Sequence, residues 1–185
     1  MFLSILSPNL NFGGNMYNTI LYPTDGSPGS DAAAEHVQYL ASTFDATVHV
    51  LHVVDTRHTG LGMGGSFLSD DGVGLSGMTD EGGGSGMVGK RLDFDEIKDS
   101  LTERGRSIVE SVAEAFGDID IVTAVKLGNP HSVIVDYADT NDADLIVMGT
   151  HGRTGVDRYL VGSVTEKVVR LAGPPVITVR ADGEG

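Results

Sequence analysis

The sequence predicts a doubly wound α/β domain in which a five-stranded parallel sheet, in the order 3-2-1-4-5, carries helices on both faces. Three observations lead to this fold class. Short apolar runs alternate with stretches whose apolar residues recur at helical spacing. The apolar runs are nearly continuous, as expected of strands that helices cover on both sides. The chain of 185 residues, 40% of them hydrophobic, is long enough for one full core.

The first half of the chain predicts two strands joined by a helix. The run TILY at 19–22 is rich in residues that favour strands and ends before a proline. Ser27 and Pro28 resemble a helix cap followed by the proline of a first turn. Apolar residues then recur at helical spacing as far as Phe44, and TVHVLHVV at 47–54 gives the second strand.

The second half continues the alternation. The apolar face of the next helix consists of Ile97, Leu101, Ile108, Val112 and Phe116. The expected elements after it are a strand within 119–126, a helix from Asn129-Pro130 to about Asn141, a strand at 144–149, a helix at 163–171 and a strand at 175–180.

Composition narrows the classes of function. The net charge is −14, from 26 acidic and 12 basic residues, and such a surface repels nucleic acids and anionic membranes. It also fits a halophilic protein, one kept soluble by an acidic surface in concentrated salt. No apolar run approaches the length of a membrane span, and without cysteine there are no disulfides or thiolate metal sites. The lack of cysteine leaves the redox compartment undetermined, and a cytoplasmic location is the expectation.

The organisation along the chain is one domain with two irregular segments. Residues 1–15 are expected to be a disordered extension, because Met16 opens a natural start. They are not interpreted as a secretory signal, because such a signal begins with basic residues and the first Lys or Arg of this chain is Arg57. The domain then covers 16–185. Within it, residues 57–92 hold 12 of the 26 glycines, which predicts a flexible insertion.

Several weaker motifs are discounted. The glycine patterns GLGMGG at 60–65 and GVGLSG at 72–77 do not open a helix, and GSGMVGKR at 84–91 has arginine where a P-loop needs serine or threonine. All three are more simply explained by a glycine-rich linker. The sequence has no G-x-S-x-G elbow and no thiol nucleophile, so no catalytic residue is assigned.

The histidines predict no metal site. His49 and His52 lie three apart on a strand and should face opposite sides of the sheet, so they cannot share a metal. His36, His58 and His131 are interpreted as surface or cap residues.

The stretch GTHGRTGVDRYLVGS, which follows the fourth strand, carries the strongest chemical signal. Gly149 ends a strand, Gly152 permits a close or left-handed backbone, and Gly162-Ser163 opens a helix. Free backbone N–H groups and the helix dipole at such a start suit a phosphate, and Arg153 could add positive charge. The alternative is a plain loop followed by a capping box between Ser163 and the glutamate three residues later.

A second loop reinforces the phosphate interpretation. In the predicted strand order, strands one and four are neighbours where the order reverses, and ligands of open α/β sheets bind at the carboxyl ends of such strands. Asp25 follows strand one, so it should face the Gly149–Ser163 loop across a crevice. A carboxylate there suits ribose hydroxyls. The alternative role for Asp25 is to cap the turn into the first helix.

These residues resemble the universal stress protein family, specifically its ATP-binding subgroup. The family's hallmark G-x2-G-x9-G-[ST] is matched by Gly149, Gly152, Gly162 and Ser163 without deviation. Four further blocks resemble the family in the same order: ILYPTDGS, VLHVVD, DLIVMGTHGRTG and PVITVR. The resemblance covers about 16–180, and the insertion at 57–92 departs from it.

The resemblance implies a Rossmann-like, adenine-nucleotide α-hydrolase-like fold that binds ATP or AMP, with Mg²⁺ held through the phosphates. By position in the motifs, it places the nucleotide against Pro23, Thr24, Asp25, Val53, Met148, Gly149, Gly152, Arg153, Gly162, Ser163, Val164 and Thr165. Asp25 is implied to contact the ribose and Val53 the adenine. Family dimers commonly pair their last strands, so a homodimer through Val176–Arg180 is also implied.

The function expected from this resemblance is a stress-response or signalling module that binds an adenine nucleotide and hydrolyses it slowly or not at all, since no side chain stands out as a general base. One alternative is an ATP-using enzyme of the related fold, of the pyrophosphatase or adenylating type, but PTDGSPGS lacks the S-G-G-x-D-S-type loop of those enzymes. Another is a dimeric interaction protein that has lost the nucleotide, against which the intact glycine motif argues.

Overall fold

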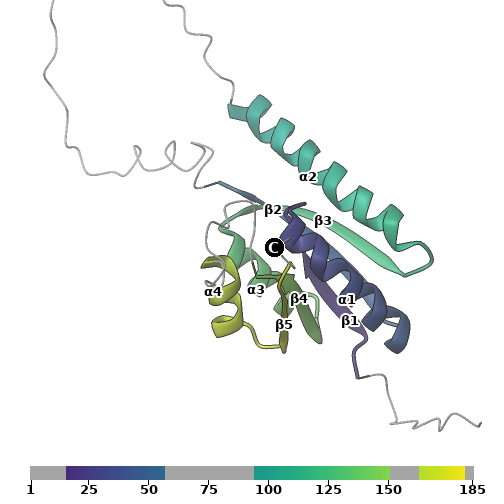
Figure 1. Cartoon of the computed structure of the whole chain (residues 1–185). Coiled ribbons are helices and arrows are strands. Elements are labelled where there is room, and N and C mark those ends of the chain that lie inside the picture. The colour runs from purple at the N-terminus through teal and green to yellow at the C-terminus, as the bar shows by residue number, and fades with distance from the viewer. Residues whose placement is uncertain (1–15, 57–93, 151–162, 182–185) are drawn as a thin grey trace, which may run out of the picture.

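The computed structural model describes residues 16–56, 94–150 and 163–181, which form an α/β sandwich around a single sheet (Figure 1). The strands are β1 (Thr19–Pro23), β2 (Thr47–Asp55), β3 (Ile121–Gly128), β4 (Leu145–Gly149) and β5 (Val176–Val179). The helices are α1 (Pro28–Phe44), α2 (Phe94–Phe116), α3 (Pro130–Thr140) and α4 (Ser163–Leu171). The insertion motifs and His58 lie outside the described residues.

The sheet has the predicted order, β3-β2-β1-β4-β5, and every described pair of neighbouring strands is parallel. The expected elements appear in the expected sequence, with one notable difference in bounds. The third strand begins at Ile121 rather than near Ile119 and extends to Gly128. The cause is the turn after α2, where Gly117 takes a φ of 64° and the chain needs three more residues to reach the sheet.

Helices cover both faces of the sheet, with α1 and α2 on one side and α3 and α4 on the other (Figure 1). The alternation of side chains along β1 divides the core accordingly. Ile20 and Tyr22 pack toward α1 and α2, whereas Leu21 packs toward Ile134 of α3 and Val168 of α4. All three β1 side chains are fully buried. The continuous apolar run in the sequence therefore reports burial on both faces.

The N-terminus of α1 is capped as the sequence predicts. Ser27 is the cap residue and Pro28 begins the helix. The Ser30 N–H donates to Oγ of Ser27 (3.3 Å), and the Ser27 N–H donates to Oγ of Ser30 (3.1 Å). This reciprocal pair satisfies two N–H groups that the helix itself leaves unpaired, so it fixes where the loop after β1 ends.

The two histidines of β2 face opposite sides of the sheet, as predicted. Nδ1 of His49 lies 3.2 Å from the Tyr137 hydroxyl on α3. His52 points to the other side, where its ring meets Gly105 of α2. His36 is exposed on α1.

Within the described residues, none of the helices combines the length and apolar character that crossing a bilayer requires. This finding concerns the described helices alone.

The environment of His49 predicts a pH-dependent stability. Burial lowers the pKa of His49 below its usual 6.5, with the Asp120 carboxylate acting in the opposite direction. The unfolded chain therefore takes up the proton first, so stability is complete above about pH 6.5 and is lost as the pH falls below it. His49→Asn, whose amide does not titrate, should reduce this loss when the free energy of unfolding is measured from about pH 7.5 to 5. His36→Asn is the control, and equal pH slopes for both variants would contradict the prediction.

Candidate functional site

The predicted site lies at the carboxyl-terminal edge of the sheet, where the strand order reverses between β1 and β4. These strands pair at Ile20 with Leu145 and at Leu21 with Ile146. Pro23 and Met148 each follow two residues further along their strands, at the edge where both connections leave the sheet. In open α/β sheets this is where ligands bind, because the two loops diverge there.

The loop that follows β1 is held in one conformation by hydrogen bonds. Thr24 is only 5% exposed, and its N–H donates to the Leu51 carbonyl of β2 (2.9 Å). The Thr24 hydroxyl donates to Oγ of Ser30 (3.1 Å) and accepts from the Gly26 N–H (3.2 Å). Gly26 has a φ of 68°, a conformation that favours glycine. Both the backbone and the hydroxyl of Thr24 therefore help to fix this loop.

Asp25 has a structural role in this loop. Its Oδ1 accepts a hydrogen bond from the Ser27 N–H (3.1 Å), which supports the turn into α1. The alternative of a turn-capping Asp25 is thus confirmed. The side chain is partly exposed at the same time, and its contact with a ribose remains a prediction.

Gly149, the first glycine of the motif, is required by packing. A Cβ at this position would overlap the carbonyl oxygen of Gly29 in the first turn of α1. Gly29 is itself buried. The end of β4 and the start of α1 therefore meet backbone to backbone, which a side chain at position 149 would prevent.

The first turn of α4 is attached to this same residue. The Thr165 hydroxyl, on a residue 4% exposed, donates to the Gly149 carbonyl (2.9 Å). Val164 packs against the core on the α3 and α4 side of the sheet. Ser163 is exposed, and the described part of α4 begins with it. The first N–H groups of a helix have no partner within the helix itself, so the start of α4 beside Gly149 is where an anion is predicted to bind.

Val53 and Met148 contribute mainly to the walls of this edge. Val53 lies two residues beyond Leu51, the register partner of Pro23, and is partly buried. Met148 is 6% exposed, with its side chain in the core on the α3 and α4 side. It can therefore offer a ligand its backbone but little of its side chain.

The structure thus brings most of the predicted site residues to one edge of the sheet: Pro23, Thr24, Asp25, Val53, Met148, Gly149, Ser163, Val164 and Thr165. Gly152, Arg153 and Gly162 lie outside the described residues. In the part of the chain that the structure describes, no group of three or more metal-ligating side chains is assembled.

Sequence reasoning missed two buried side chains, Tyr22 and His52, that form hydrogen bonds to backbone carbonyls around the β1 loop. The Tyr22 hydroxyl donates to the Ser30 carbonyl (2.7 Å), and burial raises the pKa of Tyr22 to about 12, which keeps this donor neutral. Nδ1 of His52 lies 2.8 Å from the Thr24 carbonyl. The available signal was the presence of these polar side chains inside apolar strands, since buried polar groups in strands usually have partners.

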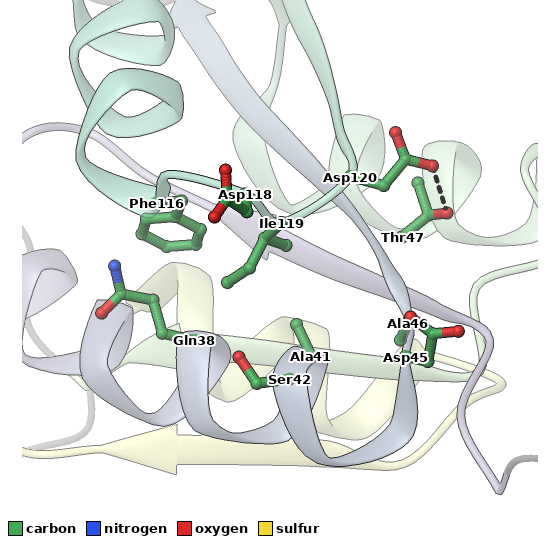
Figure 2. A pocket seen from close by; sticks show the side chains of 10 residues that line it. All are labelled: Gln38, Ala41, Ser42, Asp45, Ala46, Thr47, Phe116, Asp118, Ile119 and Asp120. Carbon is green, nitrogen blue, oxygen red and sulfur yellow. Dashed lines mark hydrogen bonds between the residues drawn. The ribbon is translucent and has the colours of Figure 1, made fainter.

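A separate hollow of about 590 Å³ lies at the opposite, amino-terminal edge of the sheet (Figure 2). Its lining includes the carboxylates of Asp45, Asp118 and Asp120, the last of which accepts a hydrogen bond from the Thr47 hydroxyl (3.0 Å). Three carboxylates repel a phosphate. None of the predicted site residues lines this hollow, so it is distinct from the motif site.

Gly149→Ala tests the backbone contact. Because the new Cβ would overlap the Gly29 carbonyl, β4 or α1 must shift, and we expect the free energy of unfolding to fall by about 2 kcal/mol or more. Gly173→Ala is the matched control, since its Cβ would meet only Oδ1 of Asp139 at 3.5 Å, an ordinary contact. Urea unfolding measures both variants, and a Gly149→Ala protein as stable as the control would refute the packing role.

Comparison with known proteins agrees with this geometry. The model of the universal stress protein family matches residues 16–69 and 78–180. Universal stress protein MJ0531 of Methanocaldococcus jannaschii is 36% identical to this chain, and the alignment covers 95% of this chain and 89% of the relative's length. Universal stress protein MJ0577 of the same organism is 32% identical over 89% of this chain and 96% of its own. The solved structure of MJ0577 superposes with a TM-score of 0.68 over 91% of this chain and 99% of that chain, at 28% identity.

More distant solved structures share the fold. A universal stress protein in complex with cAMP has a TM-score of 0.54 at 20% identity, covering 90% of this chain and 98% of that chain. A family member from Arabidopsis thaliana with AMP bound has a TM-score of 0.56 at 16% identity, covering 90% and 93%. The family model, the two archaeal relatives and the shared fold together show that this chain belongs to the universal stress protein family.

Proposed function

We propose that this protein binds an adenine nucleotide, ATP or AMP, at the carboxyl edge of β1 and β4, and that it acts as a stress-response or signalling module. The observation that carries the proposal is the hydrogen bond from Thr165 to the Gly149 carbonyl (2.9 Å). It ties the N-terminus of α4 to the end of β4, against which the first turn of α1 packs. An anion-binding helix terminus and the Asp25 loop thereby share one edge.

The proposed roles follow from the chemistry at this edge. The Asp25 carboxylate suits the ribose hydroxyls, and Val53 offers an apolar contact for adenine. The N–H groups at the start of α4, together with the Ser163 hydroxyl, suit the phosphates. The family motif adds Gly152, Arg153 and Gly162 to this phosphate cradle. Mg²⁺ would accompany the nucleotide through its phosphates.

Two family structures support the choice of ligand. One holds AMP and the other cAMP. Both ligands combine an adenine, a ribose and a phosphate, the three parts for which this edge offers apolar, carboxylate and N–H contacts. We extend this ligand class to the present chain as a proposal.

Hydrolysis is proposed to be slow or dependent on a partner. Asp25 is the carboxylate closest in sequence to the β1 edge, and it already accepts a hydrogen bond from the Ser27 N–H. No side chain of the sequence motifs stands out as a general base that would activate water. An enzyme of the pyrophosphatase or adenylating type would instead release diphosphate rapidly from ATP and Mg²⁺.

A homodimer through β5 completes the proposal. Within the described sheet β5 is an edge strand, and its backbone can pair with a second copy. Leu171 at the end of the preceding helix is 57% exposed, which provides apolar surface near that edge. The interface would centre on Val176–Arg180.

Calorimetric titration with ATP and AMP tests the nucleotide proposal. We expect binding by the wild-type protein and a loss of about tenfold or more in affinity for Asp25→Ala, since the variant removes a charged hydrogen-bond acceptor from the ribose. Asp118→Ala is the control, because it removes the same charge from the opposite edge of the sheet.

The outcomes separate the alternatives. Absence of binding to either nucleotide would contradict the proposed function, whereas equal affinities for Asp25→Ala and Asp118→Ala would contradict the placement of the ribose. Fast diphosphate release by the wild-type protein would show instead that the protein is an ATP-using enzyme of the pyrophosphatase or adenylating type.

A further inference from the structure

His52 is a buried histidine in a strand that otherwise carries mainly apolar side chains inward. It lies on β2, 9% exposed, on the face that α1 and α2 cover. Nδ1 is 2.8 Å from the Thr24 carbonyl oxygen. Because a carbonyl only accepts hydrogen bonds, Nδ1 must carry the proton and donate. The contact therefore joins the core of the sheet to the loop that precedes Asp25.

This hydrogen bond acts on the peptide group that positions Asp25. The Thr24 carbonyl and the Asp25 N–H belong to one planar unit, so fixing the carbonyl fixes the plane from which Asp25 begins. On the other side of Thr24, its N–H is held by the Leu51 carbonyl (2.9 Å). Thr24 is thus attached to β2 through both its N–H and its carbonyl.

The other side of the His52 ring supports α2. A Cβ at Gly105 would lie 2.7 Å from Cδ2 of His52 and 3.0 Å from Cγ1 of Val125. Glycine inside a helix is less favourable than alanine, so its presence in the middle of α2 needs a reason. Close packing of the helix backbone on the imidazole supplies that reason.

We infer that His52 is a positioning residue that couples the seating of α2 on the sheet to the geometry of the Thr24–Asp25 loop, and through it to nucleotide affinity. The inference rests on the proposed function. If α2 lifts from the sheet, the imidazole loses its support and the Thr24 carbonyl loses its donor. By linkage, a nucleotide that favours the ordered loop must stabilise the seated α2 to the same degree.

A conservative variant and a matched control can show whether His52 positions the loop or only stabilises the fold. His52→Asn keeps an N–H donor close to the position of Nδ1, whereas His52→Leu fills the space without one. Val48→Ala removes fully buried volume from the other end of β2 and destabilises the core away from the loop. The comparison therefore separates loss of stability from loss of the hydrogen bond.

Titration of the full chain with AMP gives the first readout. We expect His52→Leu to bind about tenfold more weakly than wild type, and His52→Asn and Val48→Ala to remain within about threefold. Gly105→Ala, which pushes on the ring from α2, should weaken AMP binding in the same direction as His52→Leu. If His52→Leu binds as well as Val48→Ala, the inference is wrong while the proposed function stands.

Hydrogen exchange gives a readout that does not need the nucleotide. Without AMP, the amides of Gly26 and Ser27 should exchange faster in His52→Leu than in Val48→Ala, because the loop has lost its anchor. Equal exchange rates would overturn the positioning role even if no nucleotide bound to the wild-type protein. With AMP, exchange in α2 should slow in wild type and not in His52→Leu; slowing in both would overturn the coupling.

Discussion

The arrangement of the site depends on the contact between two glycines, Gly149 at the end of β4 and Gly29 in the first turn of α1. Their backbones approach too closely for a Cβ at position 149. Because β1 and β4 are neighbours in the sheet, this contact sets the start of α1 directly against the end of β4. The Thr165 hydroxyl then brings α4 to the same carbonyl. Three elements, α1, β4 and α4, thus meet at one residue.

Around that contact, the β1 loop is held by groups with little conformational freedom. Ser27 and Ser30 cap α1 reciprocally, and Tyr22 holds the Ser30 carbonyl from within the core. His52 holds the Thr24 carbonyl from the neighbouring strand. These bonds together define the backbone of the loop from which Asp25 extends, and a well-defined binding loop favours affinity.

The fold was largely predictable because its signals are local. Apolar runs, the Ser27-Pro28 cap and helical spacing each depend on a few adjacent residues, and the alternation of strands with helices indicates a doubly wound parallel sheet. The glycine spacing also located the edge at which Gly149 and Ser163 lie. The start of β3 was less predictable, since Asp118–Asp120 could extend the strand or form the turn that Gly117 initiates.

The contacts that support the site were not predictable, because they are not local in the sequence. Gly149 against Gly29, Gly105 against His52 and Tyr22 against Ser30 join different elements. In the sequence each residue is seen without its partner. Gly149 was therefore interpreted through its phosphate-binding motif, and His52 only as a residue that cannot share a metal with His49. The physical reason for each residue is a partner that only the folded chain supplies.

The central claim is that the carboxyl edge between β1 and β4 is a nucleotide site. The most direct measurement is a crystal structure of the protein grown with AMP. We expect a ribose within hydrogen-bond distance of the Asp25 carboxylate and a phosphate on the N–H groups at the start of α4. AMP bound elsewhere, for instance in the acidic hollow between α1 and the turn after α2, with this edge empty, would contradict it.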